Sequence, residues 1–172
     1  LVIHGGSFTG GETIDDLVQL IDLAPTLLDE VGIEAPGFRE QIQGQSFHPG
    51  ADTDPRDRVI AEYMAPQPSM EALEKRVGTL PESVHEYDRS LRAIRTYEWK
   101  LIRGSDGTIE LYDINEDPGE SENVAGGNED AVTNLERELD DWLDSFEHAD
   151  HTGEVPMRDE TEQRLEDLGY LQ

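Results

Sequence analysis

Three side chains in the second half of the chain have the spacing of the first ligands of a calcium-binding loop. They are Asp113, Asn115 and Asp117. Such a loop needs glycine at its sixth position, where the chain bends sharply, and a bidentate glutamate at its twelfth. Here those positions hold Pro118 and Val124. The pattern therefore favours a turn capped by carboxylates over a metal site.

Two short motifs imitate catalytic loops. Gly5 and Gly10 have the separation of a phosphate-binding loop, but Gly11 stands where that loop requires lysine. The run Gly44-Gln45-Ser46-Phe47-His48 imitates a nucleophile elbow, yet it lacks the final glycine and no strand precedes it. Both motifs are predicted to be ordinary loops.

Histidines are the remaining candidates for metal ligands. His148 and His151 flank Asp150 in a polar stretch after an expected helix. An imidazole placed there commonly contacts the carbonyl end of the helix. This contact is the favoured interpretation, with a metal site as the alternative.

The elements that position these residues are clearest in the second half. Apolar and polar residues mix along 91–95 and 99–103, and the Gly104–Gly107 turn precedes a partner strand over 108–114. Pro118 stops that strand, since proline cannot donate to the sheet.

A helix is predicted over residues 129–147, because apolar residues form one stripe there at helical spacing. Asn128 is the expected N-cap, and Glu129 and Asp130 favour the positive end of the helix dipole. A helix laid across a small antiparallel sheet is the natural way to cover both apolar surfaces. The stripe consists of Val132, Leu135, Leu139, Trp142, Leu143 and Phe146.

The first half is less regular. Leu1–Ile3 is expected to end a buried strand, and a glycine-rich loop follows over 5–11. Residues 13–31 are predicted to be largely helical, or to form a short strand followed by a helix, with Asp22 as a cap and Gly32 as a left-handed terminus. Beyond them we expect a long loop over 34–55, a strand over 58–64, and a lid-like loop over 66–86 with a helical turn at 70–76.

Three separated stretches resemble the sulfatase family, in the family's order. Residues 20–29 with Gly32, Ile33 and Pro36 are similar to its "DLAPTLLDLAGI..P" segment, and Phe47 stands where the following "G.SL" has leucine. Residues 164–171 resemble the "RL..LGYL" ending. The central hairpin resembles "IRT..YKLI" and "ELYDL..DP.E..N" through Ile94-Arg95-Thr96, Trp99–Ile102, Glu110–Asp113, Asp117-Pro118, Glu120 and Asn123.

The resemblance implies the C-terminal part of an alkaline-phosphatase/sulfatase-like α/β fold. Residues 1–50 would end the main α/β domain with its last strand, loop and helix. Residues 51–150 would form a subdomain of antiparallel sheet with a packed helix, and 151–172 a tail with a short helix. Detached from its core, such a piece should expose apolar residues around Leu1–Ile3 and on the Leu17–Leu28 face.

The resemblance also implies an enzyme that hydrolyses sulfate esters of small molecules or glycans. Its nucleophile would be a formylglycine made from Cys or Ser, beside a divalent cation, calcium most often. This chain has no Cys, no Ser-x-Pro-Ser-Arg motif and no tandem Asp pair near its start. We therefore expect no catalytic, cofactor-binding or metal-binding residue here, an inactive chain, and a separate N-terminal catalytic core as its partner.

Several alternatives stay open. A phosphonate or phosphate ester hydrolase of the same superfamily shares much of this C-terminal pattern, and a stand-alone, non-catalytic interaction module is the third candidate. By the resemblance, His4 and His48 lie in loops facing the active site, where they would border a pocket rather than do chemistry. Arg95 and Lys100 are expected to pair with Glu110, Asp113 or another carboxylate rather than bind sulfate.

Charge is the other strong signal. Forty acidic residues against thirteen basic ones give the 172-residue chain a formal net charge of −27, and only Lys75 and Lys100 are lysines. This composition resembles proteins of salt-loving archaea, in which the carboxylate repulsion is screened because the Debye length is about 3 Å at molar salt. The alternative is an ordinary acidic protein. We expect the cytoplasm of a high-salt organism, with export left open.

Composition also excludes some partners and sites. No basic patch could displace counterions from nucleic acid, and no apolar run approaches the ~20 residues needed to span a membrane. The absence of cysteine excludes disulfides and thiolate metal sites within this chain.

Overall fold

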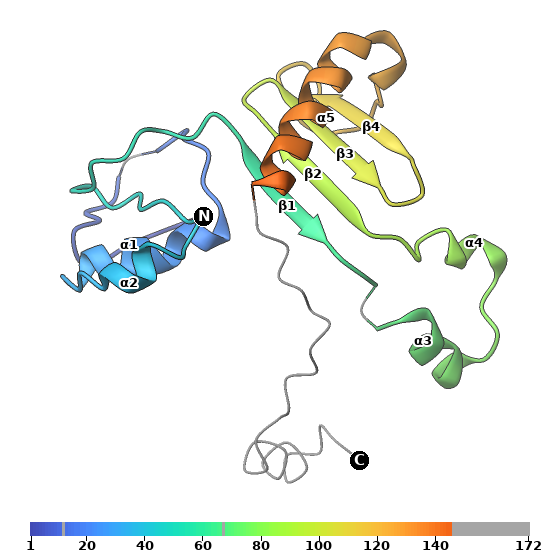
Figure 1. Cartoon of the computed structure of the whole chain (residues 1–172), viewed down its shortest axis with the longest axis horizontal. Helices are drawn as coiled ribbons and strands as arrows, with labels where there is room; N and C mark the ends of the chain where they lie inside the picture. Colours follow the sequence, from blue (N-terminus) through green and yellow to red (C-terminus); the bar gives the residue numbers. More distant parts are fainter. Residues whose placement is uncertain (12, 67, 146–172) are drawn as a thin grey trace, which may run out of the picture. The chain divides into compact units, whose positions relative to one another are not determined.

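The computed structural model describes residues 1–11, 13–66 and 68–145. Four strands form one antiparallel sheet in the order β1-β2-β3-β4 (Figure 1). They are β1 (Val59–Tyr63), β2 (Leu91–Arg95), β3 (Trp99–Gly104) and β4 (Ile109–Asp113). The predicted strands and the turn between β3 and β4 are confirmed to within a residue or two at their ends.

One row of apolar residues across the sheet forms its core. Ile60, Ile94, Leu101 and Leu111 are successive register partners on the four strands. The last three are completely buried. Residues paired in this way point to the same face, so the row presents a continuous apolar surface.

Helix α5 (Glu129–Asp144) covers this surface (Figure 1). Its Leu135 and Leu139 are buried at 5% and 0% exposure, as the predicted stripe requires. Two ion pairs tie the helix to the sheet: Arg103 to Asp140 at 2.7 Å and Arg58 to Glu138 at 3.4 Å. Phe146, the last residue of the stripe, lies outside the described residues.

The start of α5 differs from the expected cap. The carbonyl oxygen of Asn128 accepts the N–H of Val132 at 3.1 Å, which places Asn128 at the N-cap position. Its side-chain amide, however, donates to the carbonyl of Val124 at 3.0 Å, the N-cap residue of the preceding turn η2 (Ala125–Gly127). The side chain therefore fastens the helix to that turn.

Two short helices lie between β1 and β2, in the stretch predicted as a lid-like loop. They are α3 (Met70–Val77) and α4 (Glu82–His85). Glu74 links them, because its carboxylate accepts the N–H of Leu80 at 3.3 Å and lies 3.7 Å from His85. The helical turn predicted at 70–76 corresponds to α3, and α4 is a second helix in the same stretch.

The first 56 residues contain η1 (Leu20–Asp22), α1 (Leu23–Glu30) and α2 (Pro36–Arg39). Helix α1 ends as predicted: Gly32 has a φ of 69°, and the N–H of Ile33 donates to the carbonyl of Leu28 at 2.9 Å. The short helix α2 interrupts the loop predicted over 34–55.

Two expectations for this part were wrong. Residues 1–3 form no strand, and Leu1 and Val2 are 77% and 95% exposed. A strand needs a neighbour to satisfy its backbone groups, and none of the described residues supplies one there. Within 13–31, predicted as largely helical or as a short strand followed by a helix, only Leu20–Glu30 is helical; in place of a strand, the part before it has one isolated bridge, between Leu17 and Arg56.

The remaining organisational predictions are not tested. The divisions at residues 50 and 150 stay predictions, and the short helix expected within 151–172 lies outside the described residues. Within the described ranges, no helix is both long enough and apolar enough to cross a membrane.

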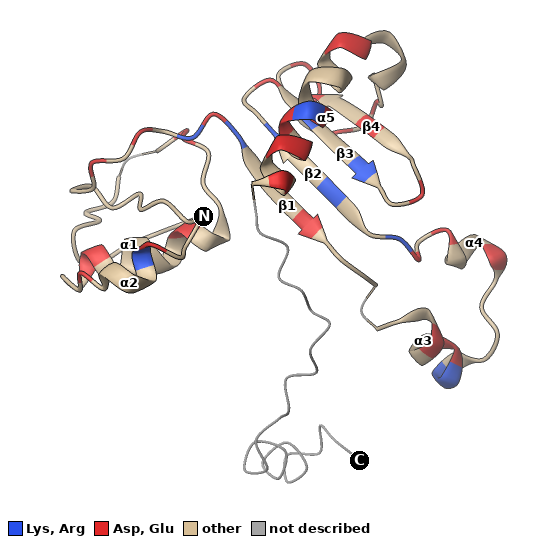
Figure 2. Cartoon of the chain, in the orientation of Figure 1, with Lys and Arg blue, Asp and Glu red and all other residues tan. Residues whose placement is uncertain are grey.

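Acidic residues occur in helices, strands and loops rather than in one block, as Figure 2 shows. Most of the described cations are used within the fold. They pair with carboxylates as Arg39–Asp29, Arg56–Asp22, Arg58–Glu138, Lys75–Glu71, Arg89–Asp106, Arg92–Glu62, Lys100–Glu120 and Arg103–Asp140. The excess of carboxylates over cations is therefore left to interact with solvent and with one another.

Truncating the centre of the sheet row should destabilise the subdomain. We expect Leu101→Ala to lower the free energy of unfolding by about 2–5 kcal/mol, because the residue is fully buried between sheet and helix. Leu20→Ala is the control, since Leu20 is 82% exposed and its truncation should change stability by less than about 0.5 kcal/mol. Urea unfolding followed by tryptophan fluorescence measures both; equal effects would contradict this core.

The charge distribution makes stability depend on salt. We expect cooperative structure in molar KCl that is weakened or lost in dilute buffer, because screening removes carboxylate repulsion. The change should be at least on the order of 1 kcal/mol in the free energy of unfolding. Circular dichroism across a KCl series tests this, with sucrose as an uncharged stabilising control. A melting temperature independent of KCl would rule out the screening explanation.

Candidate functional site

The most buried charged group in the described residues is the carboxylate of Asp22, whose side chain is 2% exposed. It accepts the backbone N–H groups of Gln19 at 2.8 Å and Gln45 at 2.7 Å. The Nε of Arg56 donates to it at 3.2 Å, and Nη2 donates to its other oxygen. Each of the two carboxylate oxygens therefore accepts two hydrogen bonds.

This arrangement corrects the prediction that Asp22 caps helix α1. Its side chain makes no cap hydrogen bond to the helix. It binds instead to residues 23 and 34 positions further along the chain. Arg56 also donates to the carbonyl of Gln43 at 3.2 Å, so the pair holds the loop around Gly44 against the start of α1.

Thr26 extends the same network by one turn of helix. Its hydroxyl donates to the carbonyl of Asp22 at 2.6 Å and accepts the N–H of Phe47 at 3.1 Å. Thr26 and Ser46 are both buried. The segment from 43 to 47 is thus fixed through Asp22, Arg56 and Thr26.

Gly44 is required by this close approach. A Cβ atom at Gly44 would lie 2.1 Å from the carbonyl oxygen of Ile21. Because that neighbour is backbone, no side-chain movement could relieve the clash. The run 44–48 is a structural loop, as predicted, and Ser46 is positioned by it rather than presented as a nucleophile.

The second cluster joins His48, Glu30 and Ser7. The Nε2 atom of His48 lies 3.1 Å from Glu30, whose oxygens also accept the backbone N–H of Ser7 at 3.1 and 3.2 Å. The Ser7 N–H, with His48 as a further donor, holds the pKa of the Glu30 carboxyl below its ordinary value. The carboxylate is thus ionised and fully used at neutral pH.

A carboxylate that orients an imidazole is the arrangement found in general acid–base catalysis, but this imidazole has no free nitrogen. The Nδ1 atom of His48 accepts the N–H of Gly50 at 3.0 Å. The hydrogen bonds therefore assign the proton of the neutral ring to Nε2, facing Glu30. His48 acts as a clamp between α1 and the loop after it.

The glycine-rich loop near the start is part of this clamp. The ring of Phe8 packs edge-on against His48 at a centroid distance of 5.9 Å and against Phe47 at 6.3 Å. A Cβ atom at Gly6 would lie 1.8 Å from the Glu30 carboxylate, so glycine is needed for the contact with Ser7. Residues 5–11 form a loop, as predicted, and its Ser7 N–H binds the protein's own Glu30 carboxylate.

A polar hollow lies beside this cluster, lined in part by Asp29, Arg39, Ser46 and His48. Arg39 binds Asp29 at 2.6 Å. The Ser46 hydroxyl, followed by Arg39, lowers the pKa of the Asp29 carboxyl. Asp29 and Arg39 in the hollow are therefore paired with each other.

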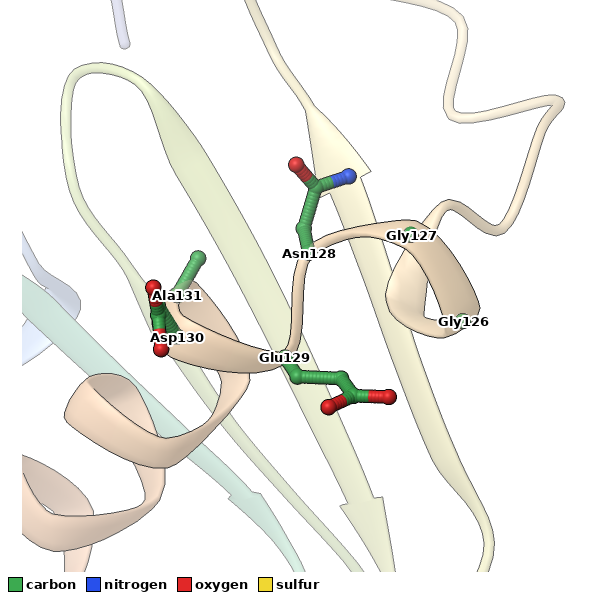
Figure 3. Close-up of a pocket in the computed structure, with 6 residues that line it drawn as sticks. All are labelled: Gly126, Gly127, Asn128, Glu129, Asp130 and Ala131. Carbon is green, nitrogen blue, oxygen red and sulfur yellow. The ribbon is translucent and has the colours of Figure 1, made fainter.

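A second hollow surrounds the start of α5, lined by Gly126, Gly127, Asn128, Glu129, Asp130 and Ala131 (Figure 3). These residues are consecutive, so the hollow is only the surface of one turn. Glu129 and Asp130 place carboxylates where a helix would otherwise attract an anion. The hollow brings together no residues that are distant in the sequence, as a binding site usually does.

The apparent calcium ligands are a pair of capped turns. Asp113 accepts the N–H groups of Asn115 and Glu116, each at 3.0 Å. Asp117 accepts the N–H groups of Ser121 and Glu122, and these bonds, with Glu122 first, lower its pKa. The carboxylates serve backbone amides, which confirms the prediction of a turn.

The other residues of the same motif are also structural. Asn123 accepts the N–H of Leu111 at 3.0 Å and donates to the carbonyl of Ile109 at 3.2 Å, which covers the outer edge of β4. Lys100 is paired with Glu120. Its prediction as a partner of some carboxylate is therefore confirmed.

Arg95 differs from Lys100. It is exposed, and it makes no ion pair with any described residue, although one had been predicted. His4 is also exposed and forms no cluster with His48. His148, Asp150 and His151 lie outside the described residues.

The described residues do not fit a metal or a nucleophilic cofactor. No group of three or more His, Asp or Glu side chains within 1–11, 13–66 and 68–145 could hold a metal ion. The buried carboxylate of Asp22 already has four donors. The described residues therefore offer no cluster that could hold the metal ion of a sulfatase-like reaction.

Comparison with known proteins finds similarity to the same family that the motifs resemble. No family model matches the chain. It is 26% identical to arylsulfatase K of Xenopus laevis over 149 residues, which cover 84% of this chain and 25% of that protein. It is 29% identical to human arylsulfatase K over 129 residues, which cover 73% and 22%. The chain thus spans about a quarter of the length of the curated relatives it matches.

Solved structures agree on the fold. A Bacteroides thetaiotaomicron protein described as a sulfatase superposes with a TM-score of 0.53 at 24% identity, over 72% of this chain and 24% of its own. A 2-O GAG sulfatase gives the same values. The fold is therefore shared with part of these sulfatase structures, and the chain is similar to sulfatases in sequence and structure.

The Asp22 network should control local stability. We expect Asp22→Ala to lower the opening free energy at the Gln19 and Gln45 amides by about 3 kcal/mol, because it leaves buried donors and Arg56 unpaired. Asp15→Ala is the control, since Asp15 is exposed. Native-state hydrogen exchange measures both variants. Equal exchange rates in the two would contradict a structural role for Asp22.

Proposed function

We propose that the protein containing this chain hydrolyses sulfate esters and that this chain is its non-catalytic C-terminal part. The similarity to arylsulfatase K, which covers 73–84% of the chain, is the observation that carries the proposal. The geometry supports it as well. Asp22, Lys100, Asp117, Glu120 and Asn123 belong to sulfatase-like motifs, and each makes contacts that hold the fold.

The catalytic groups would come from a core outside this chain. That core would carry a formylglycine made from Cys or Ser and a divalent cation, calcium being the expected one. The described residues offer neither a ligand cluster nor an unengaged acid–base pair, because His48 and Glu30 are bound to Gly50 and Ser7. The chain alone is then inactive.

An exposed apolar surface supports the existence of such a core. Leu20 and Leu27 on the first helical segment are 82% and 62% exposed, and Leu1 and Val2 are exposed as well. Leucine and valine are usually buried in a folded domain. The surface expected around Leu1–Ile3 and Leu17–Leu28 is present, and we propose that the core covers it.

The substrate class that we propose is a sulfated glycan or a smaller sulfate ester. One structural neighbour, with a TM-score of 0.52 at 24% identity, was solved with its substrate D-glucosamine-2-N,6-O-disulfate; it matches 75% of this chain and 24% of its own. A phosphate or phosphonate ester hydrolase, or a stand-alone interaction module, is the alternative. The charge of −27 further suggests an organism with high internal salt.

Enzyme assays separate these possibilities. The full-length product of the gene that encodes this chain should hydrolyse 4-nitrophenyl sulfate in molar KCl, whereas the 172-residue chain should give no turnover above the buffer rate. 4-Nitrophenyl phosphate and a phenylphosphonate ester are assayed in parallel. A preference for either would select the alternative hydrolase, and turnover by the chain alone would disprove its proposed inactivity.

A further inference from the structure

The turn between β3 and β4 contains the only Asp-Gly pair of the chain, Asp106-Gly107. In such a pair the backbone nitrogen of the glycine can attack the aspartate side chain, because glycine has no side chain to hinder the approach. The product is a five-membered succinimide, which reopens to aspartate or to isoaspartate. Asp106 and Gly107 are both exposed, so water can reach this bond.

The covalent steps balance without any added reagent. The nitrogen of Gly107 forms a bond to Cγ of Asp106, the bond from Cγ to its hydroxyl oxygen breaks, and one molecule of water leaves. Water then adds to one of the two carbonyl carbons of the succinimide. Addition at the former backbone carbonyl leaves the main chain running through Cβ and Cγ, which is isoaspartate. The turn gains one backbone atom, and the composition of the chain is unchanged.

The hairpin turn engages the nitrogen that would attack. The N–H of Gly107 donates to the carbonyl of Gly104 at 3.1 Å, and the N–H of Gly104 donates to the carbonyl of Thr108 at 2.9 Å. Gly107 has a φ of 85°, so the turn is a three-residue loop with glycine in the left-handed position. Attack requires the nitrogen to lose its proton, and this hydrogen bond keeps the proton in place.

Both carboxylate oxygens of Asp106 are bound as well. Oδ1 accepts the N–H of Thr108 at 3.1 Å and its hydroxyl at 2.7 Å, while Oδ2 accepts Nη1 of Arg89 at 2.8 Å. The Thr108 hydroxyl, followed by Arg89, lowers the pKa of the Asp106 carboxyl to about 2. The group is therefore ionised at neutral pH. An ionised carboxyl reacts more slowly than the acid, because its oxygen must be protonated to leave as water.

Arg89 reaches the turn from the segment that leads from α4 into β2. Its Nη1 also donates to the Thr108 hydroxyl at 2.8 Å. Beside it, the N–H of Ser90 donates to the hydroxyl of Ser105 at 3.1 Å, and the N–H of Ser105 donates to the carbonyl of Ser90 at 3.0 Å. Residues 89–90 are thus fastened to the turn by hydrogen bonds to Ser105, Asp106 and Thr108.

We propose that Asp106 is a site of spontaneous modification to isoaspartate, and that Arg89 and Thr108 keep it unmodified while residues 89–90 lie against the turn. The reaction begins when that contact opens, so isoaspartate at position 106 records its loss. The change is lasting, because the added backbone atom shifts Gly107 relative to its partner Gly104. The inference goes beyond the proposed function and does not depend on it.

Ageing the protein in its folded and unfolded states tests the site. The full-length product of the gene that encodes this chain is incubated in molar KCl, with and without enough urea to unfold it. Peptide mapping with isoaspartyl methyltransferase labelling measures isoaspartate at position 106. We expect accumulation in urea and at least about tenfold slower accumulation in the folded protein, where the reaction needs a local opening. In urea, Gly107→Ala should abolish most of the reaction, because its side chain hinders the attack.

Substitutions test the role of Arg89. In the folded protein, Arg89→Gln should raise the rate at Asp106 about three- to fivefold, the size expected for the loss of a partly exposed ion pair. Arg89→Lys should retain most of the protection. Arg76→Gln is the matched control, because Arg76 is exposed and has no ion pair with a described residue. In urea these three variants and the unsubstituted protein should react at one rate, since the contacts are absent there.

An internal reference separates local release from general unfolding. Asp144-Ser145, at the end of α5, can form a succinimide in the same way. A rise at Asp106 alone in Arg89→Gln supports the proposal, whereas a parallel rise at Asp144 or no rise at all would overturn the role of Arg89. Absence of isoaspartate at position 106 in urea would overturn the site, and equal rates with and without urea would overturn protection by the fold. None of these measurements uses enzyme activity.

Discussion

A carboxylate removed from water is the constraint on which the N-terminal part of this structure depends. Burying an ionised group is very unfavourable unless cations and hydrogen-bond donors replace its hydration. For Asp22 these come from Arg56 and from the amides of Gln19 and Gln45. The chain must therefore return to the start of α1 twice, and the loop between α2 and β1 has little freedom in its path.

The same logic explains why residues that look chemically active are inert here. Asp113 and Asp117 hold turns, Asn123 covers an edge strand, and His48 has both ring nitrogens engaged. The motifs that resemble those of sulfatases are thus structural in this region. A substitution at one of these positions would leave the backbone amides that it binds without their partner.

The sequence predicted the local features well and the distant pairings poorly. The strands, the Gly104–Gly107 turn, the α5 stripe and the Gly32 terminus depend on short-range spacing, so they could be read directly. The role of Asp22 could not, because its cation lies 34 positions away and nothing in the intervening residues identifies Arg56 as its partner. The prediction of a strand at Leu1–Ile3 was wrong for a related reason, because a strand needs a neighbouring strand and local spacing does not reveal one. Arg95 could be recognised as a rare cation, but the face it occupies emerged only from the register.

The segment between β1 and β2, which contains α3 and α4, can be cleaved or changed in length without disturbing the sheet. Helices α3 and α4 are joined to each other through Glu74, whereas β1 is held independently by its pairing with β2 and by Gln19, which accepts the N–H of Ile60 at 3.0 Å. A protease that cleaves between the two helices would therefore leave β1 in place, and the two pieces would stay together as a nicked but intact sheet. Insertions and deletions at the same point would alter a protruding surface without shifting the strand register, which makes it a natural place for related proteins to diverge.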